Sequence, residues 1–124
     1  HLIEPLGFEL DDARLRRAGL DYHEYASVRR HSSLAECIAT LDNPRLFAFS
    51  ARASRSFVQP KFRPGDALLF GPESDGLAPE VLAMIPPDHQ LHIPLRPSSR
   101  SLNLSNAVAV AVYEGLRQLN YPLD

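Results

Sequence analysis

Short, mostly continuous apolar runs alternate along this chain with polar stretches that contain proline or glycine. Such runs are typical of strands that are buried on both faces of a parallel sheet. The pattern predicts strands over 1–4, 45–50, 67–71 and 90–95, and an extended segment over 21–28.

Capping residues and prolines mark helices between these strands. The predicted helices span 12–19, 33–41, 79–85 and 104–119. Ser33 and Glu36 form a capping-box pattern at the start of the second helix. Pro79 occupies a favoured first position of the third. Strands alternating with helices predict an α/β domain with a mostly parallel sheet and helices on both faces.

Ligands of such domains bind beyond the carboxyl ends of the strands. Three loops have that position in the predicted order, namely 50–56, 71–78 and 95–103. We therefore expect a binding site where these loops meet.

Composition limits the classes of protein that fit. The chain has 124 residues and a net charge of −2 at pH 7, which predicts one domain without a uniformly basic surface. Cys37 is the only cysteine, so no internal disulfide forms, and no Cys/His group has zinc-site spacing. A reducing, cytoplasmic setting is the default expectation. The longest apolar run is too short to cross a bilayer.

The segment 68–82, "LLFGPESDGLAPEVL", is predicted to be a strand, a tight turn and a helix. Gly71 and Gly76 permit backbone geometry or close approach that a Cβ would block. Glu73 and Asp75 lie at the mouth of the turn and would repel phosphate, so a neutral or cationic ligand fits better. The alternative is an ordinary turn with solvated acids.

The segment 91–110, "LHIPLRPSSRSLNLSNAVAV", carries more hydroxyl and amide groups than one helix start needs. Ser101, Asn103 or Ser105 can each cap the last helix, so the surplus either solvates the turn or binds a ligand. The helix itself has a continuous apolar stripe and further apolar faces, which predicts burial in the domain or at a subunit interface.

These two segments resemble the second and third signature motifs of the SPOUT methyltransferases, the trefoil-knotted class. Within it, the chain looks most like the tRNA wobble-position ribose methyltransferases of the TrmL or YibK type, and "IEPLGFELDDARLRRAGLDYHEY" looks like their early region. The resemblance implies a single SPOUT domain over 1–124 with a deep C-terminal knot. It also implies a metal-free S-adenosylmethionine pocket, a tRNA substrate and a homodimer.

The resemblance also assigns site residues. Catalytic roles fall to Glu73, Ser101 and Asn103. Cofactor binding falls to Phe49, Ser50, Gly71, Glu73, Gly76, Ile93, Leu95, Ser101, Leu102 and Asn106. Val108, Val112 and Leu119 are expected to contact the second subunit.

RNA binding is expected at Arg14, Arg17, Arg29, Arg30 and Tyr113. Short basic runs are also common on solvated faces, and His31 beside them could pair with a carboxylate. The expected partner of the basic residues is tRNA phosphate.

The family's first motif has no match here, so the chain looks truncated, without the first strand and helix. That motif carries the arginine expected to act on the 2′-hydroxyl, which predicts impaired turnover and a weakened dimer. Two other classes stay open: a cofactor- or RNA-binding module without turnover, and an unknotted nucleotide-binding domain.

Overall fold

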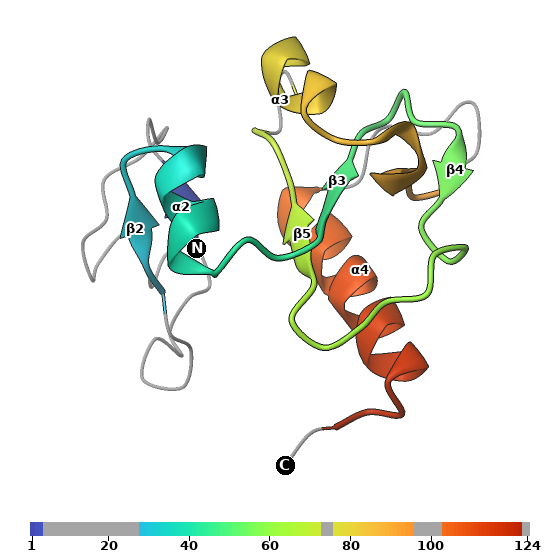
Figure 1. The fold of residues 1–124 in the computed structure, drawn as a ribbon. Helices are drawn as coiled ribbons and strands as arrows, with labels where there is room; N and C mark the ends of the chain where they lie inside the picture. The colour runs from blue at the N-terminus through green and yellow to red at the C-terminus, as the bar shows by residue number, and fades with distance from the viewer. Residues whose placement is uncertain (4–27, 73–75, 96–102, 123–124) are drawn as a thin grey trace. The chain divides into compact units, whose positions relative to one another are not determined.

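The structure, a computed structural model, describes residues 1–3, 28–72, 76–95 and 103–122 (Figure 1). The predicted helix over 12–19 and nearly all of the extended segment 21–28 lie outside these residues. The chain divides into two compact units, residues 1–43 and 44–124.

The first unit contains a two-stranded parallel sheet. Strand β1 (Leu2–Ile3) pairs with β2 (Arg30–His31), so that Ile3 lies opposite His31. The Leu2 N–H donates to the Arg29 carbonyl at 2.7 Å. The first strand was predicted, whereas β2 was not, because two polar residues have no strand periodicity of their own and take this conformation from their partner.

Helix α2 (Leu34–Thr40) follows, with Ser33 as the predicted N-cap. The Ser33 Oγ accepts a hydrogen bond from the Glu36 N–H at 3.1 Å, one half of the capping box. The Glu36 carboxylate accepts from the Ser32 hydroxyl. This bond is the main cause that lowers the pKa of Glu36.

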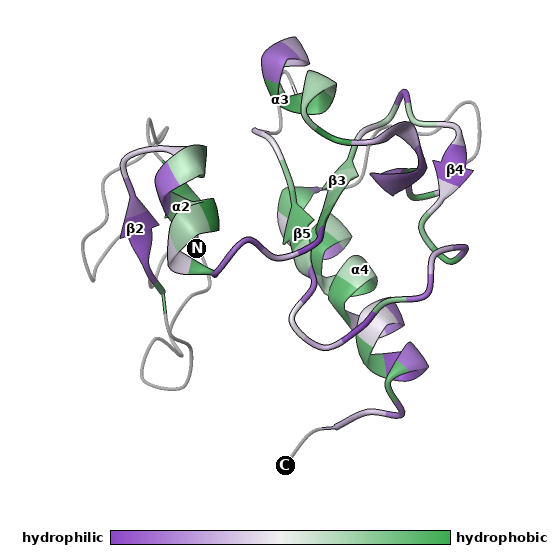
Figure 2. Cartoon of the chain, in the orientation of Figure 1, coloured by the Kyte–Doolittle hydropathy of each residue, from purple (hydrophilic) through white to green (hydrophobic). Residues whose placement is uncertain are grey.

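The second unit contains a four-stranded sheet in the order β4-β6-β3-β5, and every neighbouring pair is parallel. Its strands are β3 (Leu46–Phe49), β4 (Arg55–Ser56), β5 (Ala67–Leu69) and β6 (Gln90–His92). Figure 2 shows β3 and β5 as hydrophobic and the edge strand β4 as hydrophilic. The apolar runs therefore became strands as predicted, but β4 arises inside a predicted loop, and β6 ends at His92 before the predicted 93–95.

Aromatic side chains fill the core of this unit. Phe47 and Leu91, from neighbouring strands, are fully buried and form the core cluster with Phe62. The rings of Phe47 and Phe62 meet edge to face with centroids 5.0 Å apart. The adjacent residues Phe47 and Ala48 of the inner strand β3 point to opposite faces of the sheet and are both buried, which is the reason for the continuous apolar run in the sequence.

Two shorter helices precede β6. Helix α3 (Pro79–Ala83) begins at proline, as predicted, and a 3₁₀ turn, η1 (Pro87–His89), leads into the strand. The Gln90 side chain donates to the carbonyls of Leu82 and Ile85 at 3.0 and 2.9 Å, which ties the end of α3 to the start of β6.

Helix α4 (Leu104–Gln118) closes the second unit and matches the predicted last helix. Within the single chain α4 is only partly buried, because Val110 and Val112 are each 40% exposed and Tyr113 is 59% exposed, so burial of this helix at a subunit interface stays a prediction. The buried face instead includes Glu114, whose carboxylate accepts hydrogen bonds from Arg117 and Gln118. Within the described residues, no helix has the length and apolar character needed to span a membrane.

Candidate functional site

A pocket of about 160 Å³ lies at the carboxyl ends of β3, β5 and β6. It is lined by Phe49, Ser50, Ala51, Phe70, Gly71, Pro72, Gly76, Leu91, His92, Ile93, Leu95, Leu104 and Ala107. Three of its segments directly follow neighbouring parallel strands, and the first turn of α4 supplies another wall. This is the convergence of loops that the strand order predicts.

The walls of the pocket are largely apolar. The rings of Phe49 and Phe70 stack with centroids 4.6 Å apart and an interplanar angle of 16°. The Ser50 N–H donates to the Leu91 carbonyl at 2.9 Å, which joins the ends of β3 and β6. The Ser50 hydroxyl accepts from the Arg52 N–H at 3.3 Å. Flat apolar walls with a few polar groups suit a ligand with an aromatic ring.

His92 is the only titratable residue in the described lining of the pocket. Its Nδ1 atom is buried and has no hydrogen-bond partner among the described residues. A buried polar atom without a partner costs free energy, and a polar group of a ligand would be one way to satisfy it. Sequence analysis did not select His92, because a single histidine in a strand carries no signal by itself.

The structure shows why the turn after β5 requires glycine at two positions. A Cβ on Gly71 would lie 2.5 Å from the Leu77 nitrogen and 2.7 Å from the Gly76 oxygen. The close approach that a Cβ would block is therefore that of the chain's own backbone. Gly71 also lines the pocket, and its role in cofactor binding stays a prediction. Gly76 has a φ of +68° and donates its N–H to the Pro72 carbonyl at 2.9 Å, so it closes the turn in a conformation that favours glycine.

The polar cluster before α4 contains the helix cap. Asn103 is the N-cap, and its Oδ1 accepts from the Ser105 N–H at 2.8 Å. This decides between the three predicted caps. Asn106 is exposed and is not part of the pocket lining, so its cofactor role stays a prediction. Glu73, Ser101 and Leu102 lie outside the described residues.

Four predicted cofactor residues besides the glycines do meet in the pocket, namely Phe49, Ser50, Ile93 and Leu95. Phe70, Leu104 and Ala107 also line the pocket and were not predicted from the sequence. The signal for Phe70 was its position at the end of a predicted strand. The signal for the α4 residues was their position on the first turns of the helix after the third loop.

The predicted RNA-binding residues fall in both units. Arg29 and Arg30 are exposed and adjacent in the first unit, and Tyr113 is exposed on α4 in the second. Arg14 and Arg17 lie outside the described residues. His31 contacts the ring of His1, with Nε2 and Nδ1 2.9 Å apart. Its described hydrogen-bond partner is therefore a histidine. The carboxylate that the sequence suggested is also nearby, because, after the hydrogen bonds from Ser32, an electrostatic interaction with His31 lowers the pKa of Glu36.

A parallel sheet with an apolar pocket at its carboxyl ends, closed by the first turns of a terminal helix, defines an α/β ligand-binding fold. The SpoU rRNA methylase family matches residues 1–113. The chain belongs to this family.

Relatives with known names support this assignment. A tRNA (cytidine(34)-2′-O)-methyltransferase from Burkholderia pseudomallei is 51% identical over 123 residues, which are 98% of this chain and 79% of that protein. A solved structure concerned with 2-OH methylation of C/U34 on tRNA is 52% identical, with a TM-score of 0.86 over 97% of this chain and 78% of that one. The methyltransferase AviRb of Streptomyces viridochromogenes, solved with AdoMet, is 21% identical and shares the fold, with a TM-score of 0.81 over 96% of this chain and 49% of that one.

Proposed function

We propose that this chain is an S-adenosylmethionine-dependent tRNA methyltransferase that modifies the ribose 2′-hydroxyl of cytidine or uridine at the wobble position. One observation carries the proposal. The residues predicted to bind the cofactor come from separate segments of the chain, and six of the seven that the structure describes line one pocket, all except Asn106. The identity of about one half to the Burkholderia relative, across nearly the whole chain, names the substrate class.

The described residues fit the cofactor. The stacked Phe49 and Phe70 rings and the aliphatic side chains of Ile93 and Leu95 would hold the adenine and its apolar surroundings. Ser50 and the unpartnered Nδ1 of His92 offer polar groups for the ribose or the amino-acid part. When bound, S-adenosylmethionine supplies an electrophilic methyl group on a sulfonium.

The protein's own contribution is mainly positioning. The hydrogen bond from Gly76 to Pro72 and the cap at Asn103 hold the described ends of two of the segments beside the pocket, which favours a set geometry for the reacting groups. The described lining has no carboxylate, and His92 is its only titratable group. The resemblance gives catalytic roles to Glu73, Ser101 and Asn103 and the action on the 2′-hydroxyl to an arginine of the family's first motif, so the role of proton acceptor is assigned to no described residue.

The same proposal includes a homodimer and a C-terminal trefoil knot. The exposed Val110 and Tyr113, three residues apart on one side of α4, support a second subunit, because large apolar side chains on one helix face favour a protein contact. Val112 is exposed on another side of the same helix. The parallel order of the strands and the position of α4 beside the pocket are compatible with the knot. A tRNA substrate and a lone cysteine support a cytoplasmic setting.

A matched pair of substitutions on α4 tests the pocket. Ala107 lines it, whereas Ala109 is exposed two residues further along the same helix. We expect Ala107→Met to weaken S-adenosylhomocysteine binding at least about tenfold in calorimetry, because the added side chain fills the pocket, and Ala109→Met to leave it unchanged. Equal effects of the two variants would contradict this location of the site.

Methyl transfer tests the reaction itself. Tritiated S-adenosylmethionine is supplied with unmodified tRNA transcripts that carry C, U, A or G at position 34. We expect label in the C and U transcripts, and loss of label when the 2′-hydroxyl is replaced by hydrogen. If the chain binds S-adenosylhomocysteine but no label enters the tRNA, the alternative of a cofactor- or RNA-binding module without turnover is favoured.

A further inference from the structure

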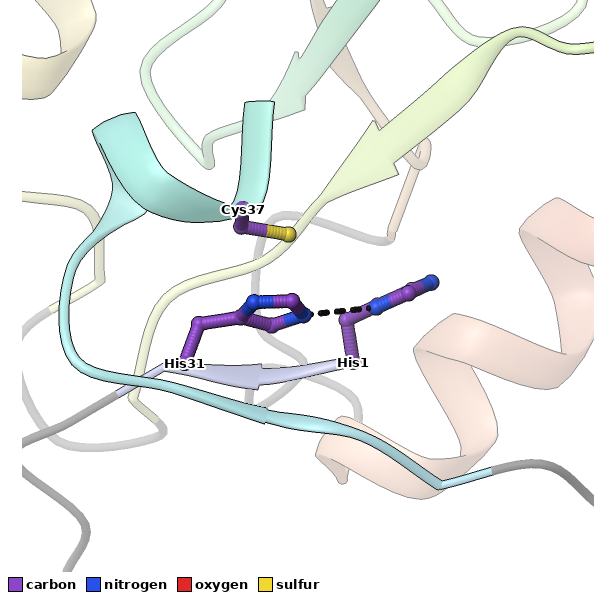
Figure 3. Close-up of side chains that lie close together, drawn as sticks. All are labelled: His1, His31 and Cys37. Carbon is purple, nitrogen blue, oxygen red and sulfur yellow. Dashed lines mark hydrogen bonds between the residues drawn. The ribbon is translucent and has the colours of Figure 1, made fainter. Parts of the chain in front are cut away.

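Three metal-ligating side chains meet in the first unit. His1 precedes β1, His31 ends β2 and Cys37 lies on α2, and their ligand atoms all fall within 4.8 Å of one another. Figure 3 shows the Cys37 side chain beside the His31 ring, with the His1 ring facing His31. No spacing in the sequence predicts this group, because parallel pairing of β1 and β2 brings residues 1 and 31 together.

The cluster contains the most buried side chains that the structure describes in this unit. Among the described residues of 1–43, His31 and Cys37 are the only buried ones, each 5% exposed, while His1 is exposed. The described elements here are two-residue strands and a seven-residue helix, which bury little apolar area by themselves. Small units with little core commonly depend on a metal or another cross-link.

The three ligand atoms of the cluster indicate which metal it would bind. Two imidazole nitrogens and one thiolate sulfur are ligands typical of Zn²⁺. In a tetrahedral zinc site, neighbouring ligand atoms are roughly 3.3–3.6 Å apart, which follows from the usual bond lengths. The nitrogens of His1 and His31 are 2.9 Å apart, and the largest separation in the cluster is below 4.8 Å. Small side-chain movements would therefore bring all three atoms to the required distances.

We propose that His1, His31 and Cys37 form a Zn²⁺ site in the first unit, with three protein ligands and a water at the fourth position on the exposed side of His1. The site shares no residue with the pocket of the second unit. The metal would join β1, β2 and α2, and the site does not depend on the proposed methyl transfer.

The binding step balances in protons. In the metal-free cluster, one of the two facing ring nitrogens donates its hydrogen to the other. The metal needs the lone pairs of both facing nitrogens. The hydrogen between them therefore moves to the other nitrogen of its own ring, and both imidazoles stay neutral. The Cys37 thiol releases one proton to solvent as the Zn–S bond forms. Binding therefore releases one proton and strengthens as the pH rises.

Cobalt provides the direct test, because Co²⁺ occupies zinc sites and a thiolate ligand adds a charge-transfer band in the near ultraviolet. We expect the full chain, reduced and freed of metal, to show this band at one equivalent of Co²⁺ and to lose it when Zn²⁺ is added. Cys37→Ser should remove the band, and the control His89→Gln should keep it, since His89 is outside the cluster. Absence of the band in the unsubstituted protein, or its persistence in Cys37→Ser, overturns the proposal.

A second measurement does not depend on any substitution. Cys37 is the only cysteine, so a thiol reagent reports on it alone. We expect one equivalent of Zn²⁺ to slow modification of Cys37 at least about tenfold and a chelator to restore the rate. An unchanged rate with Zn²⁺ present would show that the thiol is not a ligand. Chelation by the N-terminal amine and the His1 ring alone would also leave the rate unchanged.

Discussion

Arg45 holds Asp66 through two parallel hydrogen bonds, from Nε to Oδ1 at 2.8 Å and from Nη2 to Oδ2 at 2.6 Å. The Asp66 side chain is 8% exposed and also accepts the Arg63 N–H at 2.7 Å. Because Arg45 precedes β3 and Asp66 precedes β5, the pair sets the start of the two strands whose other ends form the pocket.

Removing the Asp66 charge should destabilise the chain in a pH-dependent way. Burial is the largest single influence on the pKa of Asp66 and raises it, but the hydrogen bonds and charges of Arg45 and Arg63 together lower it. A lowered pKa contributes stability that is present above about pH 4, the ordinary value, and is lost as the pH falls through the folded value.

We therefore expect Asp66→Asn to cost about 1–3 kcal/mol of unfolding free energy at pH 7 and clearly less near pH 3. Urea unfolding at both pH values measures this. The exposed Asp88→Asn removes the same charge as a control and should change little. An equal loss for Asp66→Asn at both pH values would rule out the ion pair as its cause.

Gly71→Ala should damage the turn itself. The new Cβ would overlap the backbone of Gly76 and Leu77, which cannot move as a side-chain tip does. We expect a loss of about 1–3 kcal/mol in unfolding free energy, accompanied by weaker S-adenosylhomocysteine binding. Gly115→Ala is the control, because no atom lies within 4 Å of its Cβ position, and alanine in a helix should gain about 0.5–1 kcal/mol. If Gly71→Ala has the same unfolding free energy as the unsubstituted chain, the backbone of this turn can move to accommodate the Cβ.

Two substitutions of Asn103 distinguish a role in capping α4 from a role in the reaction. Asn103→Ala should cost about 1 kcal/mol of unfolding free energy, since the Ser105 N–H loses its acceptor. Asn103→Asp keeps the acceptor oxygen and should keep the stability. If the side chain only caps α4, the aspartate variant also keeps methyl transfer. A stable aspartate variant with an activity loss of about tenfold, worth one hydrogen bond, would instead assign the amide N–H₂ a part in the reaction.

Gln118 links α4 to the core. Its Oε1 accepts the N–H of the buried Phe62 at 2.8 Å, and its Nε2 donates to the Pro60 carbonyl at 3.1 Å. Gln118→Ala leaves both groups without this partner, so we expect a loss of about 1–3 kcal/mol in thermal or urea unfolding. The exposed Gln59→Ala serves as the control. Equal stability of the two variants would mean that water replaces the Gln118 side chain.

Several features of the fold could be predicted from local pattern. The apolar runs that became β3, β5 and β6 could be recognised by their hydrophobicity, and the first and last of these are inner strands of the sheet. The start of α2 at Ser33 and the span of α4 follow from capping chemistry and helical periodicity. Since parallel strands end at one edge, even the meeting of the three loops was predictable.

Only the tertiary structure decided the remaining features, because they depend on atoms that are far apart in the sequence. Arg30–His31 and Arg55–Ser56 become strands only because a partner strand supplies their hydrogen bonds. Gly71 is required by the backbone of Gly76, and Glu114 is buried because Arg117 and Gln118 satisfy its carboxylate. The cluster of His1, His31 and Cys37 arises from strand pairing across thirty residues. Local sequence sets which segments are buried and how helices begin, whereas contacts between distant segments set which side chains share one site.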